Sequence, residues 1–147
     1  MADGTLVMER DFDAPREKVW EAWTDPDVLA AWFGPEGWSV TAGSVMVEPR
    51  PGGVWRLVMA SDEDPLSVSP IEAELGAFEP PSLLVGRTAA TPESGGQVME
   101  LRVELEESGR GTRMRLSQGP YPEEVLEMAG GGWEQSFAKL ERLLARG

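Results

Sequence analysis

The sequence contains no cysteine and no histidine, and its only tyrosine is Tyr121. These absences exclude disulfide bridges, thiol nucleophiles, imidazole general bases and metal sites built on cysteine or histidine. Any catalysis would have to use carboxylates, hydroxyls, amides, lysine, arginine or Tyr121. We therefore expect no metal and no cofactor, and an enzyme is the less expected class of protein.

Basic residues are also scarce, since 13 Lys and Arg stand against 26 Asp and Glu, a formal net charge of -13. A surface this acidic repels nucleic acid and anionic membranes, so neither is an expected partner. No apolar run approaches the ~20 residues that span a bilayer. The start, Met1-Ala-Asp-Gly, lacks the basic and apolar segments of a signal peptide. We expect an acidic, cytoplasmic protein.

The 147 residues, 41% of them hydrophobic, predict a single domain over 1–147 with one core. Alternation over residues 5–13 predicts a strand, which is interrupted on its apolar side by Arg10. Two short helices follow, one from Pro15 and one from Pro26, because proline suits a first helical position and Asp25 can cap the second. Alternation and turn residues then predict strands at residues 38–47, 54–60, 68–78, 83–88, 98–106 and 112–117.

The last two strands form the clearest predicted hairpin. A four-residue loop over 108–111 places Glu106 opposite Arg113 and Glu104 opposite Arg115 on the outer face. Strands joined by such turns form an antiparallel sheet, and the fold class is therefore α+β.

From Tyr121 onward the apolar period returns to 3.6 residues, which predicts one long C-terminal helix whose stripe packs on the sheet. Three consecutive glycines at 130–132 interrupt it at a cost of about 1 kcal/mol each. They either permit close backbone packing or loosen the helix at the mouth of a cavity.

Seven short segments follow one another along nearly the whole chain: Ala14-Pro15 to Val19-Trp20, Thr24-Asp25-Pro26, Trp32-Phe33-Gly34-Pro35, Pro51-Gly52-Gly53-Val54-Trp55-Arg56, Pro80-Pro81-Ser82-Leu83-Leu84-Val85, Gly111-Thr112-Arg113 and Gly132-Trp133-Glu134-Gln135-Ser136-Phe137. In this order and spacing they resemble the activator of heat-shock-protein-90 ATPase homologue family, a branch of the START-like (SRPBCC) superfamily. The resemblance implies a helix-grip fold, in which a curved antiparallel sheet of six to seven strands wraps around the C-terminal helix. It also implies a cavity between them, where superfamily members typically bind apolar or amphipathic small molecules.

Large apolar side chains are predicted to converge between this sheet and the helix. Tryptophan and methionine suit such a cavity, since aromatic rings bury much surface and methionine adapts to irregular partners. The predicted ligand-binding wall comprises Trp32, Trp38, Trp55, Leu57, Met59, Met99, Leu101, Met114, Trp133 and Phe137. The polar candidates for orienting a carbonyl or carboxylate of the ligand are Thr41, Arg87, Thr88, Gln135 and Ser136.

Binding of a small hydrophobic ligand is thus the leading interpretation, and two alternatives remain. One is a chaperone-associated interaction module that acts through its surface and has a filled core. The other is a cyclase- or hydratase-like enzyme, which would need a buried carboxylate or Tyr121 in the cavity. A homodimer through an exposed edge strand is also possible.

Overall fold

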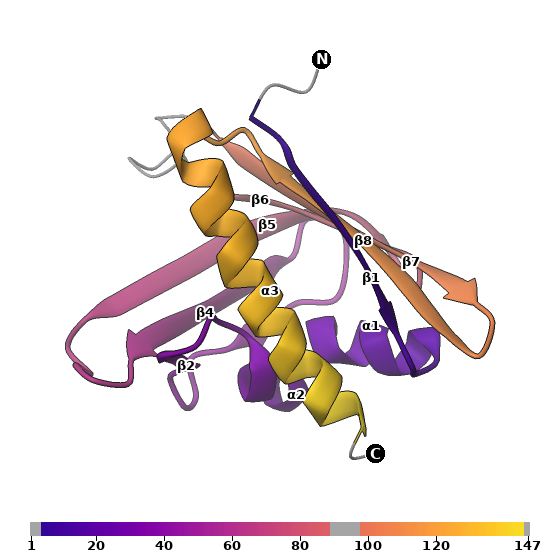
Figure 1. Ribbon diagram of the computed structural model, residues 1–147, viewed down its shortest axis with the longest axis horizontal. Coiled ribbons are helices and arrows are strands. Elements are labelled where there is room, and N and C mark those ends of the chain that lie inside the picture. Colours follow the sequence, from indigo (N-terminus) through magenta and orange to yellow (C-terminus); the bar gives the residue numbers. More distant parts are fainter. Residues whose placement is uncertain (1–3, 89–97, 146–147) are drawn as a thin grey trace.

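The elements follow the predicted order of one strand, two helices, further strands and a long helix (Figure 1). The computed structural model describes residues 4–88 and 98–145. Residues 1–3, which belong to the start that lacks the segments of a signal peptide, lie outside the described residues. The elements are β1 Leu6–Phe12, α1 Arg16–Thr24, α2 Pro26–Trp32, β2 Trp38–Val40, β3 Met46–Val47, β4 Val54–Ser61, β5 Val68–Glu79, β6 Leu83–Thr88, β7 Met99–Ser108, β8 Gly111–Gly119 and α3 Glu123–Ala145.

The strands form one antiparallel sheet in the order β1-β8-β7-β6-β5-β4-β2, with β3 paired to β4. The sheet curls, and α3 lies across its concave side while α1 and α2 close one end (Figure 1). This confirms the expected α+β helix-grip arrangement. The concave side follows from the alternation in the strands, whose inward rows are apolar.

The segment 38–47, predicted as one strand, is instead the two short strands β2 and β3. A turn separates them, in which Ser44 N donates to the carbonyl oxygen of Thr41 at 3.1 Å. Gly43 supplies the positive φ of 77° that this turn requires and that other residues rarely adopt. The strand prediction was wrong here because it passed over a turn glycine.

The predicted register of the β7–β8 hairpin is confirmed, because Glu106 lies opposite Arg113. Its loop is shorter than predicted, since Ser108 and Gly111 pair directly and leave a turn of two residues. Gly109, the first residue of that turn, has a φ of 61°, which glycine adopts without strain.

Among the described residues, neither of the two opposite-charge pairs that this register places on the outer face forms a salt bridge. Arg113 Nε donates to Asp11 Oδ1 on β1 at 3.1 Å, and Arg102 Nε donates to Glu104 Oε2 at 2.9 Å. A correct register therefore places opposite charges near one another without deciding which of them pair, because β1 adds a competing row of carboxylates on the same face.

The two short helices begin at the predicted prolines, although α1 starts one residue later. Pro15 is the residue before α1 and provides no side-chain cap. Asp25 caps α2 as expected, since its Oδ1 accepts from the backbone N–H groups of Asp27 at 2.9 Å and Val28 at 3.3 Å.

The core fills the end of the molecule where α1 and α2 meet the C-terminal half of α3. Trp23 and Trp32 are 0% exposed and pack edge to face at 5.0 Å between ring centroids. Trp32 Nε1 donates to the carbonyl oxygen of Ala22 at 2.8 Å, which satisfies its buried N–H. Within residues 4–88 and 98–145, no helix combines the length and apolar character needed to cross a membrane.

Candidate ligand-binding cleft

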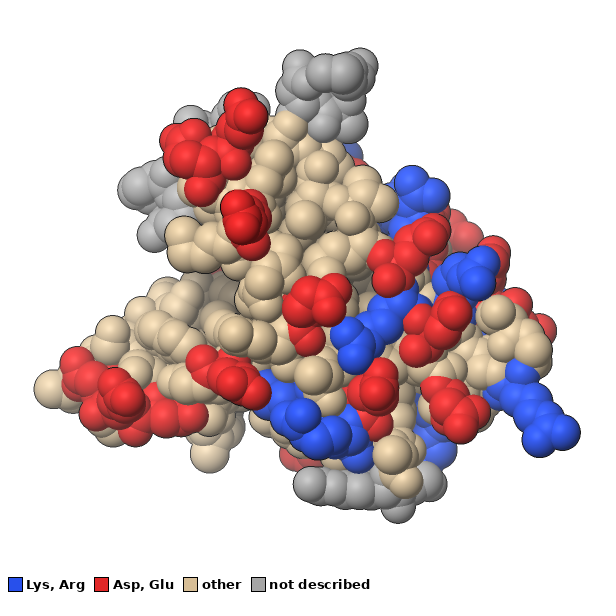
Figure 2. Space-filling view, viewed as in Figure 1, with Lys and Arg blue, Asp and Glu red and all other residues tan. Residues whose placement is uncertain are grey.

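An open cleft of about 190 Å³ lies between the N-terminal half of α3 and the strands β4, β5 and β8. Figure 2 shows the surface hollowed beside this half of the helix, with uncharged residues around the hollow. The lining residues are Phe33, Met59, Ile71, Gln118, Tyr121, Ala129, Gly132, Trp133 and Ser136.

The sheet side of the cleft depends on the loop that follows α2. Gly34 has a φ of 106°, and a Cβ built there would lie 2.9 Å from Met59 Sδ. Glycine therefore lets this loop pass close over Met59 and turn back toward β2. Beneath it, Phe33 packs edge to face on Trp133 at 5.6 Å and forms the floor between loop and helix.

The helix side of the cleft includes Gly132, and the structure corrects the interpretation that the glycines permit close packing. A Cβ on Gly131 would meet nothing within 4 Å, and one on Gly132 would meet only Pro35 Cβ at 4.0 Å. A Cβ on Gly130 would lie 3.5 Å from Leu6 Cδ1, an ordinary contact. The glycines therefore leave space that side chains could occupy.

The polar groups of the cleft converge on one amide. Gln118 Oε1 accepts hydrogen bonds from the Tyr121 hydroxyl and from Trp133 Nε1, each at 2.7 Å. Ser136 satisfies its own hydroxyl within the helix by donating to the carbonyl oxygen of Gly132 at 3.1 Å. Burial raises the pKa of Tyr121 to about 12, so this phenol remains protonated at neutral pH.

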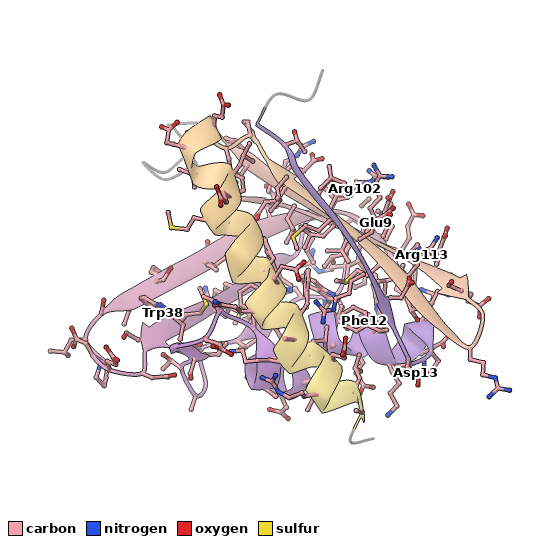
Figure 3. All side chains as sticks on the ribbon, viewed as in Figure 1. Glu9, Phe12, Asp13, Trp38, Arg102 and Arg113 are labelled. Carbon is pink, nitrogen blue, oxygen red and sulfur yellow. The ribbon has the colours of Figure 1, made fainter. Side chains whose placement is uncertain are left out.

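The predicted wall residues divide between this cleft and the core. Met59 and Trp133 line the cleft. The others pack in or around the core, except for Trp38, which lies half-buried at the start of β2 (Figure 3). The buried ones are Trp32, Trp55, Leu57, Met99, Met114 and Phe137, and Leu101 is partly buried against the core. Phe137 stacks on Trp133 at 5.4 Å, so it supports the cleft from behind.

Among the predicted polar candidates, only Ser136 lines the cleft. Gln135 instead accepts from Glu36 N at 3.1 Å, and Arg87 pairs with Glu100 on the outer face at 3.2 Å. Gln118 was missed, because the strand prediction ended at residue 117. The alternation of inward residues along β8, continued by one more step, would have found it.

A second hollow of about 430 Å³ lies on the outer face of the sheet, among residues that include Glu9, Glu104, Arg113 and Arg115. Glu9, on β1, and Arg113, on β8, have their side chains on the side of the sheet away from α3 (Figure 3). The strand register places opposite charges side by side here, because Arg115 on β8 lies between Glu9 on β1 and Glu104 on β7. Because carboxylates and guanidinium groups cover this hollow, it suits an apolar ligand less well than the smaller cleft.

The fold and cleft can now be compared with known proteins. Residues 13–145 match the family described as "Activator of Hsp90 ATPase homolog 1-like protein". The chain belongs to this family. The match extends from just after β1 to the end of α3, so it includes every residue of the cleft.

Solved structures of similar proteins have the same fold. A crystal structure of a Nitrosomonas europaea protein is 27% identical with a TM-score of 0.84, covering 99% of this chain and 97% of that one. The crystal structure of the AHSA1 protein from Silicibacter pomeroyi is 24% identical with a TM-score of 0.78, covering 96% of this chain and 97% of that one. No curated protein matches the chain.

Proposed function

We propose that the protein reversibly binds a small apolar or amphipathic molecule in the cleft between α3 and the sheet. The observation that carries this proposal is the lining itself, which is mainly aromatic and aliphatic and holds one convergent polar group at Gln118. Concave apolar pockets with a few placed polar groups are the usual form of small-molecule sites. Trp133 and Met59 are the proposed ligand contacts, and the predicted wall residues in the core support them.

The size of the cleft restricts what it can enclose. Ligand pockets typically hold about 300–1,000 Å³, and this cleft has about 190 Å³. It therefore encloses a small molecule or one end of a longer one, while the remainder lies along the open side. An amphipathic ligand fits this geometry, because its polar portion can stay in water.

Two leucine variants on neighbouring helix positions test the proposal. Gly132 lines the cleft, so Gly132→Leu adds a side chain at its wall, whereas a Cβ on Gly131 would meet nothing within 4 Å. Both changes remove a helix glycine, so their effects on helix propensity are matched. Binding of the uncharged dye Nile red is followed by its emission.

We expect Gly132→Leu to weaken dye binding about tenfold, as an overpacked site costs roughly 1–3 kcal/mol. Gly131→Leu should bind the dye as the unchanged protein does. Equal binding by the two variants would exclude the cleft as the binding site.

A surface role beside a chaperone is the second candidate function. The family description names activation of the Hsp90 ATPase, and apolar residues are exposed near the β4–β5 turn, where Leu66 is 91% and Val68 54% exposed. Stimulation of a purified Hsp90-type ATPase that falls with Leu66→Ser would support this role. An ATPase rate unchanged by the protein would oppose it.

Acid–base catalysis is not favoured by the cleft. Its described lining includes no carboxylate, lysine or arginine. Tyr121 does line it, but burial raises the pKa of its phenol and so opposes a role as general base.

A further inference from the structure

The orientation of the Gln118 side-chain amide is determined by its neighbours. The Trp133 indole N–H can only donate, so the group facing it at 2.7 Å must be the carbonyl oxygen of Gln118. The Tyr121 hydroxyl donates to that same oxygen at 2.7 Å. With two donors on its oxygen, the amide cannot turn over without facing its own N–H groups toward an indole N–H.

The nitrogen of this amide therefore remains available. Within the described part of the chain, Gln118 Nε2 donates to no acceptor, and it carries two N–H groups. The described side-chain atoms that are both fully buried and unpartnered are Arg10 Nε, Arg16 Nε and Trp23 Nε1. Gln118 Nε2 is not one of these fully buried atoms, and the residue that carries it lines the cleft.

The electrostatic surroundings disfavour an anion in this place. No described lining residue carries a charge. Glu123 and Glu124 form the acidic first turn of α3, the half of the helix that borders the cleft, and Figure 2 shows carboxylates over that end. A ligand carboxylate would lose hydration beside apolar walls and would gain no cation in return.

We propose that the cleft selects uncharged ligands that carry a carbonyl oxygen, which accepts a hydrogen bond from Gln118 Nε2 while the apolar part lies against Trp133 and Met59. This inference rests on the proposed binding function and adds a specificity-determining residue to it. A ligand whose only polar group is a donor gains less, because the carbonyl oxygen of Gln118 already accepts two hydrogen bonds. The amide thus favours a ligand group that accepts a hydrogen bond over one that only donates.

Gln118→Glu is a sharp test, because the side chain keeps its shape. One carboxylate oxygen can still accept from Tyr121 and Trp133, while the other replaces the donor by an acceptor. Gln118→Met removes both functions and serves as a second variant. Unfolding by urea and Gly132-dependent binding of Nile red establish that each variant is folded and has kept its cleft.

The ligands compared are a medium-chain methyl ketone, the primary alcohol of the same chain length and the corresponding fatty-acid anion, each by displacement of Nile red. We expect the unchanged protein to bind the ketone more tightly than the anion. Gln118→Glu should bind the ketone about tenfold more weakly, because one hydrogen bond is lost and the new carboxylate oxygen faces the ketone oxygen, so that neither can donate. The alcohol, which can donate, should lose much less.

Equal loss of ketone and alcohol in Gln118→Glu, or no loss of either, would overturn the inference while leaving the binding function in place. A ketone that the unchanged protein fails to bind, although Nile red binds in a Gly132-dependent manner, would overturn it as well. If Nile red binding does not depend on Gly132, the proposed function itself fails.

Discussion

Replacing the three glycines of α3 by alanine should stabilise the protein. Glycine in a helix interior costs roughly 0.5–1 kcal/mol relative to alanine, mainly through the entropy of the unfolded chain. The structure accepts the added methyl groups, since the tightest contact is 3.5 Å, from Gly130 to Leu6 Cδ1. The sum for the three positions is therefore about 1.5–3 kcal/mol.

The increase is measured as the free energy of unfolding in urea, followed by far-ultraviolet circular dichroism. For a chain of this length, 1 kcal/mol corresponds to about 2–4 °C in Tm, so the melting temperature should rise by roughly 3–12 °C. Gly111→Ala is the contrasting variant, because its Cβ would collide with the carbonyl oxygen of Phe12. That variant should be less stable than the unchanged protein.

A triple-alanine variant that is no more stable than the unchanged protein would refute this reasoning, because the added methyl groups would then cause a strain that the described contacts do not show.

The same variant tests the cavity-mouth interpretation. If the glycines form a gate, Nile red should dissociate more slowly from the stiffened helix. An unchanged dissociation rate of Nile red would exclude a gating role for the glycines.

Two further predictions concern the ion pairs between Arg10 and α3 and the single tyrosine. Arg10 on β1 donates to Glu134 at 3.4 Å and to Glu141 at 3.0 Å on α3, and its side chain is only 24% exposed. Arg10→Met should therefore lower the free energy of unfolding by about 1 kcal/mol. Arg102→Met, on the outer face, should lower it less, and an equal loss for the two variants in urea unfolding would contradict a special role for the ion pairs of Arg10. Burial raises the pKa of Tyr121 from 10.0 to about 12. The contribution of this phenol to stability is therefore fully present below pH ~10 and is lost as the pH rises toward about 12. Tyrosinate absorbance reports this one residue, and a midpoint near 10 in the folded protein would show that the phenol is not buried.

Local sequence patterns predicted most of the fold because the strands are half-buried and alternate. The pattern succeeded even for the register of the last hairpin, where the inward row of β8 allows only one phase. It failed at Gly43, where one residue of positive φ divides a continuous apolar alternation. The sequence also could not show that Arg10, placed on the apolar side of β1, meets Glu134 and Glu141 on a helix more than a hundred positions later.

The cleft was harder to predict than the fold, for a physical reason. An inward alternation looks the same whether the space beyond it is filled or hollow. Trp55 and Met59 lie on the same face of β4, but Trp55 is 3% exposed and donates to the carbonyl oxygen of Trp23 at 2.9 Å, whereas Met59 borders the cleft. The difference depends on how far α3 stands from each part of the sheet, which no local spacing encodes.

The pairing of the first strand with the last has a consequence for biosynthesis. Among the described strands, β1 pairs with β8 alone, and Thr112 Oγ1 donates to the carbonyl oxygen of Ala14 across a sequence separation of 98. A nascent chain must therefore emerge almost completely from the ribosome before its earliest strand finds a partner. Such distant closure slows folding, and until β1 and β8 pair, both strands expose edges that can pair with other chains.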